Sequence, residues 1–223
     1  STVGNISFQG GTYTNGQSDT FTYGTSGPAT ANAPTCWEFH HWEVGGNVSV
    51  SDPNANPTTV TITCGGTLKA VFTQIEYTLT VNVVGSGSVT KNPDQLTYPC
   101  GTQVTLTAVP DPCWTFSHWS GDLTGSTNPD TITMDSDKTV TAHFTKINYT
   151  LTITSTSGGT TSPVPGAYQH PCSSNVQVTA IPEPCYQFDH WELDTVDVGS
   201  ANPYTVHMDG NHTLHAVFTK INY

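Results

Sequence analysis

The chain has 223 residues, of which 17 are acidic and five are lysines, and it contains no arginine, so its formal net charge is −12. This balance excludes nucleic acid as a partner, because phosphate binding requires clustered cations. Six cysteines among few charged residues favour an extracellular or cell-surface location, where disulfides persist. No run of about 18 apolar residues occurs, so we expect no direct membrane span.

The first predicted module, residues 1–75, closes with two alternating runs. Apolar and polar residues alternate along Asn56–Thr73 (NPTTVTITCGGTLKAVFT), which is the period of a β-strand. Cys64-Gly65-Gly66 interrupts the alternation and predicts a hairpin turn. An aromatic motif, PTCWEFHHW (Pro34–Trp42), precedes these runs.

The second predicted module, residues 76–147, has the same parts in the same order. Its aromatic motif is DPCWTFSHW (Asp111–Trp119), and NPDTITMDSDKTVTAHFT (Asn128–Thr145) aligns without gaps to the closing runs of the first module. The hairpin turn falls at Asp135–Asp137. Two further alternating runs, TLTVNV and TQVTLTAV, lie ahead of the aromatic motif. A module therefore consists of about five short strands.

The third predicted module, residues 148–223, repeats the pattern with EPCYQFDHW (Glu183–Trp191) and NPYTVHMDGNHTLHAVFT (Asn202–Thr219). The phenylalanine that closes each module falls at positions 72, 144 and 218. No stretch carries an apolar stripe with the helical period of about 3.6 residues. We therefore predict an all-β protein of three tandem repeats, each a small β-sandwich or β-grasp-like sheet.

At the boundaries between modules, the apolar residues switch from one face of the extended chain to the other. Val140, Ala142 and Phe144 share one parity, whereas Ile147 and Tyr149 have the other. Because a one-residue shift sends a side chain to the opposite face, an extended segment here leaves one core and joins the next. The same change predicts joining strands without flexible linkers at the other seams, at Ile75 and Tyr77 and at Ile221 and Tyr223.

The second module resembles the internalin B-repeat, also called the Listeria–Bacteroides repeat, of bacterial and archaeal surface proteins. The resemblance lies in the order YTLTV, GSGSV, YPCGTQVTLTAVPD, WTFSHWSGD and STNPDTITMDSDKTVTAHF. It covers Tyr77–Thr145 well, the third module fairly, and the first module weakly at its front half. It implies a surface-exposed, non-catalytic β repeat. The chain departs from the family pattern in its cysteines and in the histidine before each tryptophan.

Each module holds two cysteines, and we predict that one disulfide staples each module. In the second and third modules the two cysteines are 13 residues apart. In the first module Tyr23 stands where the other modules have their first cysteine, and the second cysteine, Cys64, lies in the predicted hairpin turn instead. A disulfide requires only that its two cysteines lie close in space, so we expect the pair to stay within the module. The alternative is a zinc site, but the sequence lacks the paired C-x2-C spacing that is typical of zinc ligands. The predicted pairs are Cys36 with Cys64, Cys100 with Cys113, and Cys172 with Cys185.

A histidine precedes the tryptophan that ends every aromatic motif, in the pairs His41-Trp42, His118-Trp119 and His190-Trp191. We expect the aromatic residues to build the core and a hydrogen bond to hold each histidine; the alternative is a histidine that binds metal or sugar. Acidic turns at Asp135–Asp137 and Asp194–Asp197 offer oxygen ligands for a hard cation. Two carboxylates are a weak ligand set, so we favour solvated turns and predict no metal and no cofactor.

The sequence predicts no enzyme. No nucleophile elbow, phosphate loop or HExxH motif occurs. Glu38 and Glu43 flank the first aromatic strand, but Thr115 and Ser120 occupy the matching positions of the second module. A tandem repeat without a shared acid pair argues against a repeated active site.

Four asparagines head N-x-S/T sequons, which accept glycan in exported chains. So much serine and threonine also produces such matches by chance. The possible glycosylation sites are Asn5, Asn47, Asn148 and Asn211.

The favoured function is structural: a stiff string of β modules that forms an extracellular filament or a cell-surface stalk. The alternative is an adhesin or carbohydrate-binding surface module, with polysaccharide as its partner. That alternative requires Trp37, Trp114 and Tyr186 to form a planar row in solvent.

The chain's last six residues, FTKINY, repeat Phe144–Tyr149, where they open a module. We therefore predict that the partners are copies of the chain itself, joined head to tail, either as one continuous polypeptide or as subunits that dock terminal strands. Joining Tyr223 to Ser1 gives KINYSTVGNISF. The predicted assembly strand holds Tyr223, Ile6 and Phe8 on one face, in the roles of Tyr149, Leu151 and Ile153.

Overall fold

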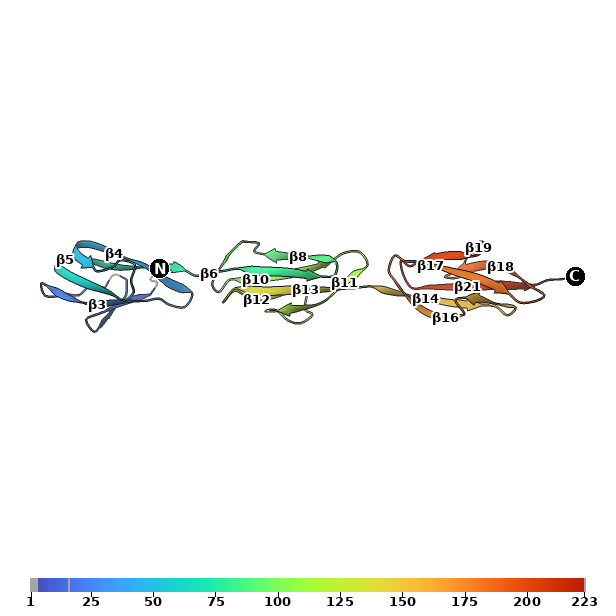
Figure 1. Ribbon diagram of the computed structural model, residues 1–223, viewed down its shortest axis with the longest axis horizontal. Helices are drawn as coiled ribbons and strands as arrows, with labels where there is room; N and C mark the ends of the chain where they lie inside the picture. Colours follow the sequence, from blue (N-terminus) through green and yellow to red (C-terminus); the bar gives the residue numbers. More distant parts are fainter. Residues whose placement is uncertain (1–3, 16, 223) are drawn as a thin grey trace. The chain divides into compact units, whose positions relative to one another are not determined.

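A computed structural model describes residues 4–15 and 17–222 of the chain. Every regular element in these ranges is a β-strand, which confirms the predicted all-β class (Figure 1). The described residues contain no helix long and apolar enough to cross a membrane. The strands belong to two compact units. The first comprises the described residues through Val81 with Lys91–Leu106 and Pro129–Val140, and the second comprises Asn82–Thr90, Thr107–Asn128 and the described residues from Thr141 onward.

The first module forms one five-stranded sheet in the order β2-β1-β3-β5-β4. β4 and β5 pair over most of their length. β5 runs through Cys64–Gly66 as one strand with an irregular register, so the predicted hairpin turn there is wrong. Phe8, Ala29, Trp42 and Val60 are among the buried residues of its core. The strands are β1 (Asn5–Phe8), β2 (Gly11–Tyr13), β3 (Thr25–Asn32), β4 (Trp37–Val50) and β5 (Thr58–Gln74).

The middle module contributes two three-stranded sheets, β12-β10-β8 and β11-β13-β7, and a short ladder between β6 and β9. β10 and β12 are antiparallel, with Val104 opposite Ile132. β12 and β13 belong to different sheets, so the turn at Asp135–Asp137 joins two sheets and the predicted hairpin there is wrong. The strands are β6 (Glu76–Tyr77), β7 (Leu79–Val84), β8 (Gly87–Asn92), β9 (Tyr98–Pro99), β10 (Gln103–Pro110), β11 (Trp114–Gly121), β12 (Asp130–Thr133) and β13 (Lys138–Lys146).

The third module consists of a five-stranded sheet, β16-β14-β21-β18-β19, and a three-stranded sheet, β15-β17-β20. The core draws on both sheets, and Leu151, Val178, Trp191 and Leu214 within it are fully buried. The strands are β14 (Asn148–Ser155), β15 (Gly159–Ser162), β16 (Gly166–Pro171), β17 (Asn175–Pro182), β18 (Tyr186–Leu193), β19 (Val196–Gly199), β20 (Tyr204–His207) and β21 (His212–Lys220).

One asparagine in each module bonds both backbone groups of an alanine on a neighbouring strand. Asn202 Oδ1 accepts the Ala180 N–H at 2.9 Å, and Asn202 Nδ2 donates to the Ala180 carbonyl at 2.9 Å. Asn56 with Ala31 and Asn128 with Ala108 make the same two bonds. Because the bonds are the same in all three modules, Ala31, Ala108 and Ala180 occupy equivalent positions.

We expect Asn202→Ala to lower the free energy of unfolding of the third module by roughly 2–4 kcal/mol, because a half-buried backbone N–H and C=O lose their partners. Chemical denaturation measures the loss. The matched control is Asn175→Ala, which removes only an exposed bond to His207 and is expected to cost less than about 1 kcal/mol. Equal losses for the two variants would contradict this role for Asn202.

Strand β1 corresponds to β15 and not to β14. Ile6 lies opposite Ala31 in the β1–β3 pair, as Thr161 lies opposite Ala180 in the β15–β17 pair. A side chain added at Gly4 would collide with the Phe72 ring, as one at Gly159 would with Phe218. The predicted roles of Ile6 and Phe8 as counterparts of Leu151 and Ile153 are therefore wrong, and Tyr223 lies outside the described residues.

Candidate functional site at the module junctions

The chain remains extended where one module passes into the next. Thr145 and Lys146 end β13, and β14 begins at Asn148, so the predicted extended segment is confirmed. Tyr149 packs half-buried against the third core, as expected of a residue that has joined the next module. The Ile147 side chain is also half-buried rather than fully buried.

One isoleucine at each junction bonds the backbones of two cysteines. The Ile75 N–H donates to the Cys36 carbonyl at 2.9 Å, and the Cys100 N–H donates to the Ile75 carbonyl at 2.8 Å. Ile147 makes the same two bonds with Cys113 and Cys172, at 2.8 and 2.9 Å. The isoleucine thus holds the two cysteines of each junction on either side of itself.

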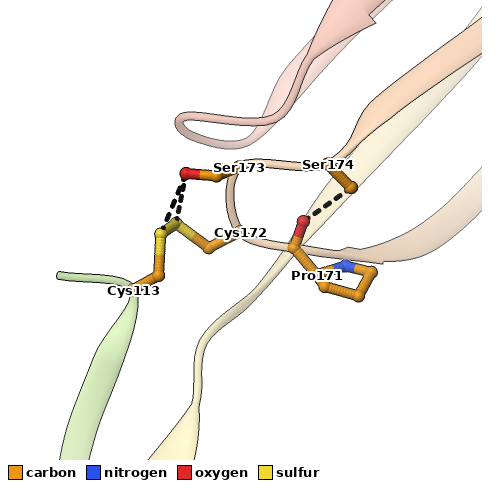
Figure 2. The surroundings of a disulfide bond; sticks show 5 residues. All are labelled: Cys113, Pro171, Cys172, Ser173 and Ser174. Carbon is orange, nitrogen blue, oxygen red and sulfur yellow. Dashed lines mark hydrogen bonds between the residues drawn. A yellow bond between two sulfur atoms is a disulfide. The ribbon is translucent and has the colours of Figure 1, made fainter. Parts of the chain in front are cut away.

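The disulfides join consecutive modules, and the predicted pairing within modules is wrong. Cys36 pairs with Cys100 and Cys113 with Cys172, with Cα–Cα distances of 5.2 and 5.4 Å (Figure 2). Cys64 and Cys185 are exposed and unpaired within the part of the chain that the structure describes. Disulfides therefore occur, but not one per module.

Strand length explains why the predicted pairs cannot form. β10 has 8 residues and separates Cys100 from Cys113. An 8-residue strand spans about 26 Å, whereas a disulfide needs Cα atoms within about 7 Å. Cys172 and Cys185 flank β17 in the same way. Each module therefore carries its cysteines at opposite ends, where they can reach only a neighbouring module.

The first module follows the same rule. Cys36 adjoins Trp37, which pairs with Gln74 at the open end of the β4–β5 hairpin. Cys64 lies between Ile62 and Gly66, which pair with Val48 and Gly46 far along the same ladder. The predicted bond from Cys36 to Cys64 would therefore have to span most of the hairpin.

We call the Cys36, Cys113 and Cys185 positions the outgoing ends of the three modules. All three cysteines have left-handed backbone, with φ values of 69°, 68° and 68°. The Ile221 N–H donates to the Cys185 carbonyl at 2.9 Å, as Ile75 and Ile147 do at their junctions. The third module therefore carries the complete outgoing half of a junction, with its thiol unpaired.

We call Tyr23–Gly24, Cys100–Gly101 and Cys172–Ser173 the receiving ends. The N–H groups of Gly24, Gly101 and Ser173 donate to the carbonyls of Ile62, Met134 and Met208, at 3.0, 2.8 and 2.8 Å. Tyr23 therefore stands where the other modules have their bridging cysteine, and its side chain is 86% exposed. Cys64 follows Ile62 by two residues, so the first module carries a thiol at its receiving end on a different strand.

The Cys113–Cys172 bridge has a hydroxyl beside it. Ser173 Oγ lies 3.1 Å from Cys113 Sγ and 3.8 Å from Cys172 Sγ (Figure 2). Ser174 Oγ donates to the Pro171 carbonyl at 2.6 Å and closes the turn that presents the cysteine. Thr102 Oγ1 makes the equivalent bond to Pro99 at the first junction, also at 2.6 Å.

The His-Trp pairs divide into a core residue and a surface residue. Trp42, Trp119 and Trp191 are at most 3% exposed, and each Nε1 donates to a backbone carbonyl at 2.9–3.1 Å. His190 Nδ1 lies 3.1 Å from Asp189, and His118 stacks on His143 with ring centroids 4.3 Å apart. The predicted core role of the tryptophans is confirmed. Trp37, Trp114 and Tyr186 are half-buried.

The carboxylates of the acidic turn at Asp135–Asp137 contact groups of the protein itself. Asp137 Oδ1 accepts the Thr78 N–H at 2.7 Å, and this bond lowers the pKa of the Asp137 carboxyl. Asp135 forms an ion pair of 2.5 Å with Lys138, whose hydrogen bond lowers the Asp135 pKa. Within residues 4–15 and 17–222 no group of three His, Cys, Asp or Glu side chains is arranged to hold a metal ion.

His212 bridges two carboxylates in the third module. Its Nδ1 lies 2.6 Å from Asp194 and its Nε2 lies 2.7 Å from Asp209. The hydrogen bond to Asp194 raises the pKa of His212; partial burial opposes the rise, and the bond to Asp209 adds to it. The pKa of Asp209 is lowered chiefly by His212, and that of Asp194 by the Thr213 N–H and then by His212.

We expect His212→Gln to reduce stability more at pH 5.5 than at pH 8.5. The raised histidine pKa contributes stability that is complete below about pH 6.5 and is lost as the pH rises through the folded-state value. The lowered aspartate pKa values add a contribution that is lost as the pH falls below about 4. Thermal midpoints at both pH values measure the difference, with exposed Thr205→Ala as the control. A larger effect at pH 8.5 would reverse the assigned sign.

The sequons lie in different surroundings. Asn47, Asn148 and Asn211 are exposed, whereas Asn5 is half-buried and its Oδ1 accepts a hydrogen bond from Asn32 at 2.7 Å. Asn211 Oδ1 accepts the Thr150 N–H at 2.8 Å and leaves its Nδ2 for a glycan. Glycosylation at these four positions stays a prediction.

Comparison with known proteins identifies the repeats. The family model of the divergent InlB B-repeat domain matches residues 2–76, 77–148 and 149–222, which confirms the resemblance seen in the sequence. No curated protein and no solved structure matches the chain.

Proposed function

Since the chain belongs to the divergent InlB B-repeat family, whose domains are repeat modules of surface proteins, we propose that it is the structural unit of an extracellular filament or cell-surface stalk, assembled head to tail. The observation that carries this proposal is the outgoing half-junction at Cys185 and Ile221. At the other two outgoing ends, the same backbone arrangement leads to a disulfide with the following module.

The partner of Cys185 is Cys64 of a second copy. The first module lacks a cysteine at position 23, where the other modules receive their bridge, but it presents the exposed Cys64 at the same end. Bridge formation joins two sulfur atoms and releases two protons and two electrons, which an oxidant of the extracellular compartment accepts. Both unpaired cysteines then have a role in the assembly.

The contact joins two different surfaces of the same chain, so it does not close on itself by a twofold axis. Heterologous contacts of this kind extend into open fibres unless their rotation closes a ring. A net charge of −12 disfavours non-specific aggregation of the copies.

Non-reducing peptide mapping of a mixture of isotope-labelled and unlabelled protein tests the proposal. After oxidation, we expect the peptide with Cys64 to be linked to the peptide with Cys185, with one labelled and one unlabelled partner. Electron microscopy of the same sample should show fibres. Free thiols at both positions, with only single particles in the micrographs, would overturn the proposal.

The adhesin alternative gains no specific support from the aromatic residues on which it depended. It required Trp37, Trp114 and Tyr186 to form an exposed row, and all three are half-buried. The indole rings of the His-Trp pairs lie in the cores.

A further inference from the structure

The first strand of the third module is held between two neighbours. β14 pairs antiparallel with β16, where Leu151 lies opposite Tyr168, and parallel with β21, where Ile153 lies opposite Leu214. Leu151 and Ile153 are at most 1% exposed. β14 therefore completes both the sheet and the core of its module.

The described part of the first module contains no counterpart of this strand. Because β1 corresponds to β15, the described chain enters the module at its second strand. With Gly4 aligned to Gly159, Ser1 aligns with Thr156 and Tyr223 with Tyr149. Direct joining of Tyr223 to Ser1 would therefore provide no residues for the positions of Thr150–Ser155.

The neighbours of the missing strand are left open. Leu68, Ala70 and Phe72 are half-buried, whereas Leu214 and Ala216 are 0% exposed and Phe218 is 6% exposed. A groove of 700 Å³ runs along Thr67–Phe72, and an adjoining cavity of 560 Å³ reaches Phe8 and Val60. Residues 17–22, which align with β16, form no strand here.

The free backbone edge faces this groove. In the third module, the Phe218 N–H donates to Thr156 Oγ1 at 2.8 Å, and the Ala216 carbonyl accepts the Thr156 N–H at 2.9 Å. Alternate residues of β21 thus direct their backbone groups toward β14. By register, the same groups of Leu68, Ala70 and Phe72 point into the groove.

We propose that the first module is a strand acceptor, in which the groove along Thr67–Phe72 binds an extended strand of β14 chemistry. The bound strand runs parallel to β5 and antiparallel to residues 17–22. Its inward positions carry a tyrosine followed by two aliphatic residues, as Tyr149, Leu151 and Ile153 do in β14. Main-chain hydrogen bonds provide affinity and the alternate side chains provide specificity.

The groove connects to the proposed head-to-tail assembly through Cys64, and this step alone rests on that assembly. The β14 backbone is anchored by Asn211, and the matching residue of the first module is Gly65. Cys64 lies beside this glycine, so the proposed Cys64–Cys185 bridge replaces the missing anchor.

A synthetic peptide with the sequence of Ile147–Thr156 (INYTLTITST) tests the acceptor groove on the whole chain. At a free peptide concentration of about 100 times Kd, we expect the amides of Leu68, Ala70 and Phe72 to exchange about 100-fold more slowly. The thermal midpoint of the first module should rise by roughly 10 °C. The control peptide INYTTLTIST exchanges Leu151 with Thr152 and Ile153 with Thr154, which turns the aliphatic residues outward, and should not bind.

A matched variant of the chain tests the location of the binding site. Ala70→Trp places an indole in the groove and should abolish peptide binding, while hydrogen exchange in the third module confirms that the variant is folded. Failure of the monomeric wild-type chain to bind the peptide, or slow exchange at Leu68–Phe72 in the monomer before peptide is added, would overturn the acceptor role even if oxidised samples form fibres. Peptide binding by a chain that stays monomeric after oxidation would support the groove and refute the head-to-tail assembly.

Discussion

Replacing Trp191 by alanine is expected to lower the free energy of unfolding of the third module by about 3–5 kcal/mol. The indole is 0% exposed, and its ring centroid lies 5.1 Å from that of Phe188. Its removal leaves a cavity and also deprives the Ala201 carbonyl of the Nε1 hydrogen bond of 3.1 Å. This loss is comparable to the whole stability of a small domain, so the third module should unfold near physiological temperature.

Chemical denaturation, with hydrogen exchange to assign the unfolding to one module, measures this effect. Trp191→Phe keeps most of the apolar volume and should cost roughly 1–2 kcal/mol less than the alanine variant. Trp42→Ala provides a comparison in the first module, where the indole is 3% exposed and its ring centroid lies 5.2 Å from that of Phe39. A loss below about 1 kcal/mol for Trp191→Ala would show that the third core does not depend on the indole.

The strands could be predicted because their pattern is local. The alternation in Asn202–Thr219 predicts that Val206, Leu214 and Phe218 point inward, and all three are buried in one core, although β20 and β21 belong to different sheets. Thr and Val at neighbouring positions favour extended backbone, and the turn between the runs is marked by Asp209 and Gly210. Such signals depend on neighbouring residues and survive without knowledge of the partner strands.

The disulfide partners could not be predicted by proximity in sequence. Cys100 and Cys113 are close in sequence but lie at opposite ends of β10. The length of that strand was already visible as the run TQVTLTAV, and at about 3.3 Å per residue it places the two cysteines too far apart to bond. Strand length was therefore the signal that would have excluded the wrong pairs.

The identity of β1 could not be read from its residues. Ile6 and Phe8 alternate with polar residues as Leu151 and Ile153 do, because a period of two describes every half-buried strand. The difference lies in the partner: β1 pairs with β3, whereas β14 pairs with β16 and β21. Only the hydrogen-bonded register reveals that the described first module lacks its first strand.

Substituting either unpaired cysteine by serine is expected to abolish covalent assembly completely. In an oxidised sample of the unsubstituted chain, Cys64 of one copy bonds Cys185 of the next, so a non-reducing gel should show a ladder of regular steps. Cys64→Ser or Cys185→Ser alone removes one half of every intermolecular bridge, and only monomer should remain. Neither change touches the bridges Cys36–Cys100 and Cys113–Cys172, so each variant should keep the stability of the parent chain.

Mixing the two single variants separates head-to-tail pairing from other thiol chemistry. The Cys64→Ser chain retains Cys185, and the Cys185→Ser chain retains Cys64, so an oxidised equimolar mixture has one compatible pair of ends. It should give a covalent dimer and nothing larger, because the bridge uses Cys185 of one chain and Cys64 of the other, and serine occupies the other two positions. A dimer formed by either variant alone would reveal pairing between identical cysteines, which contradicts the proposed heterologous contact.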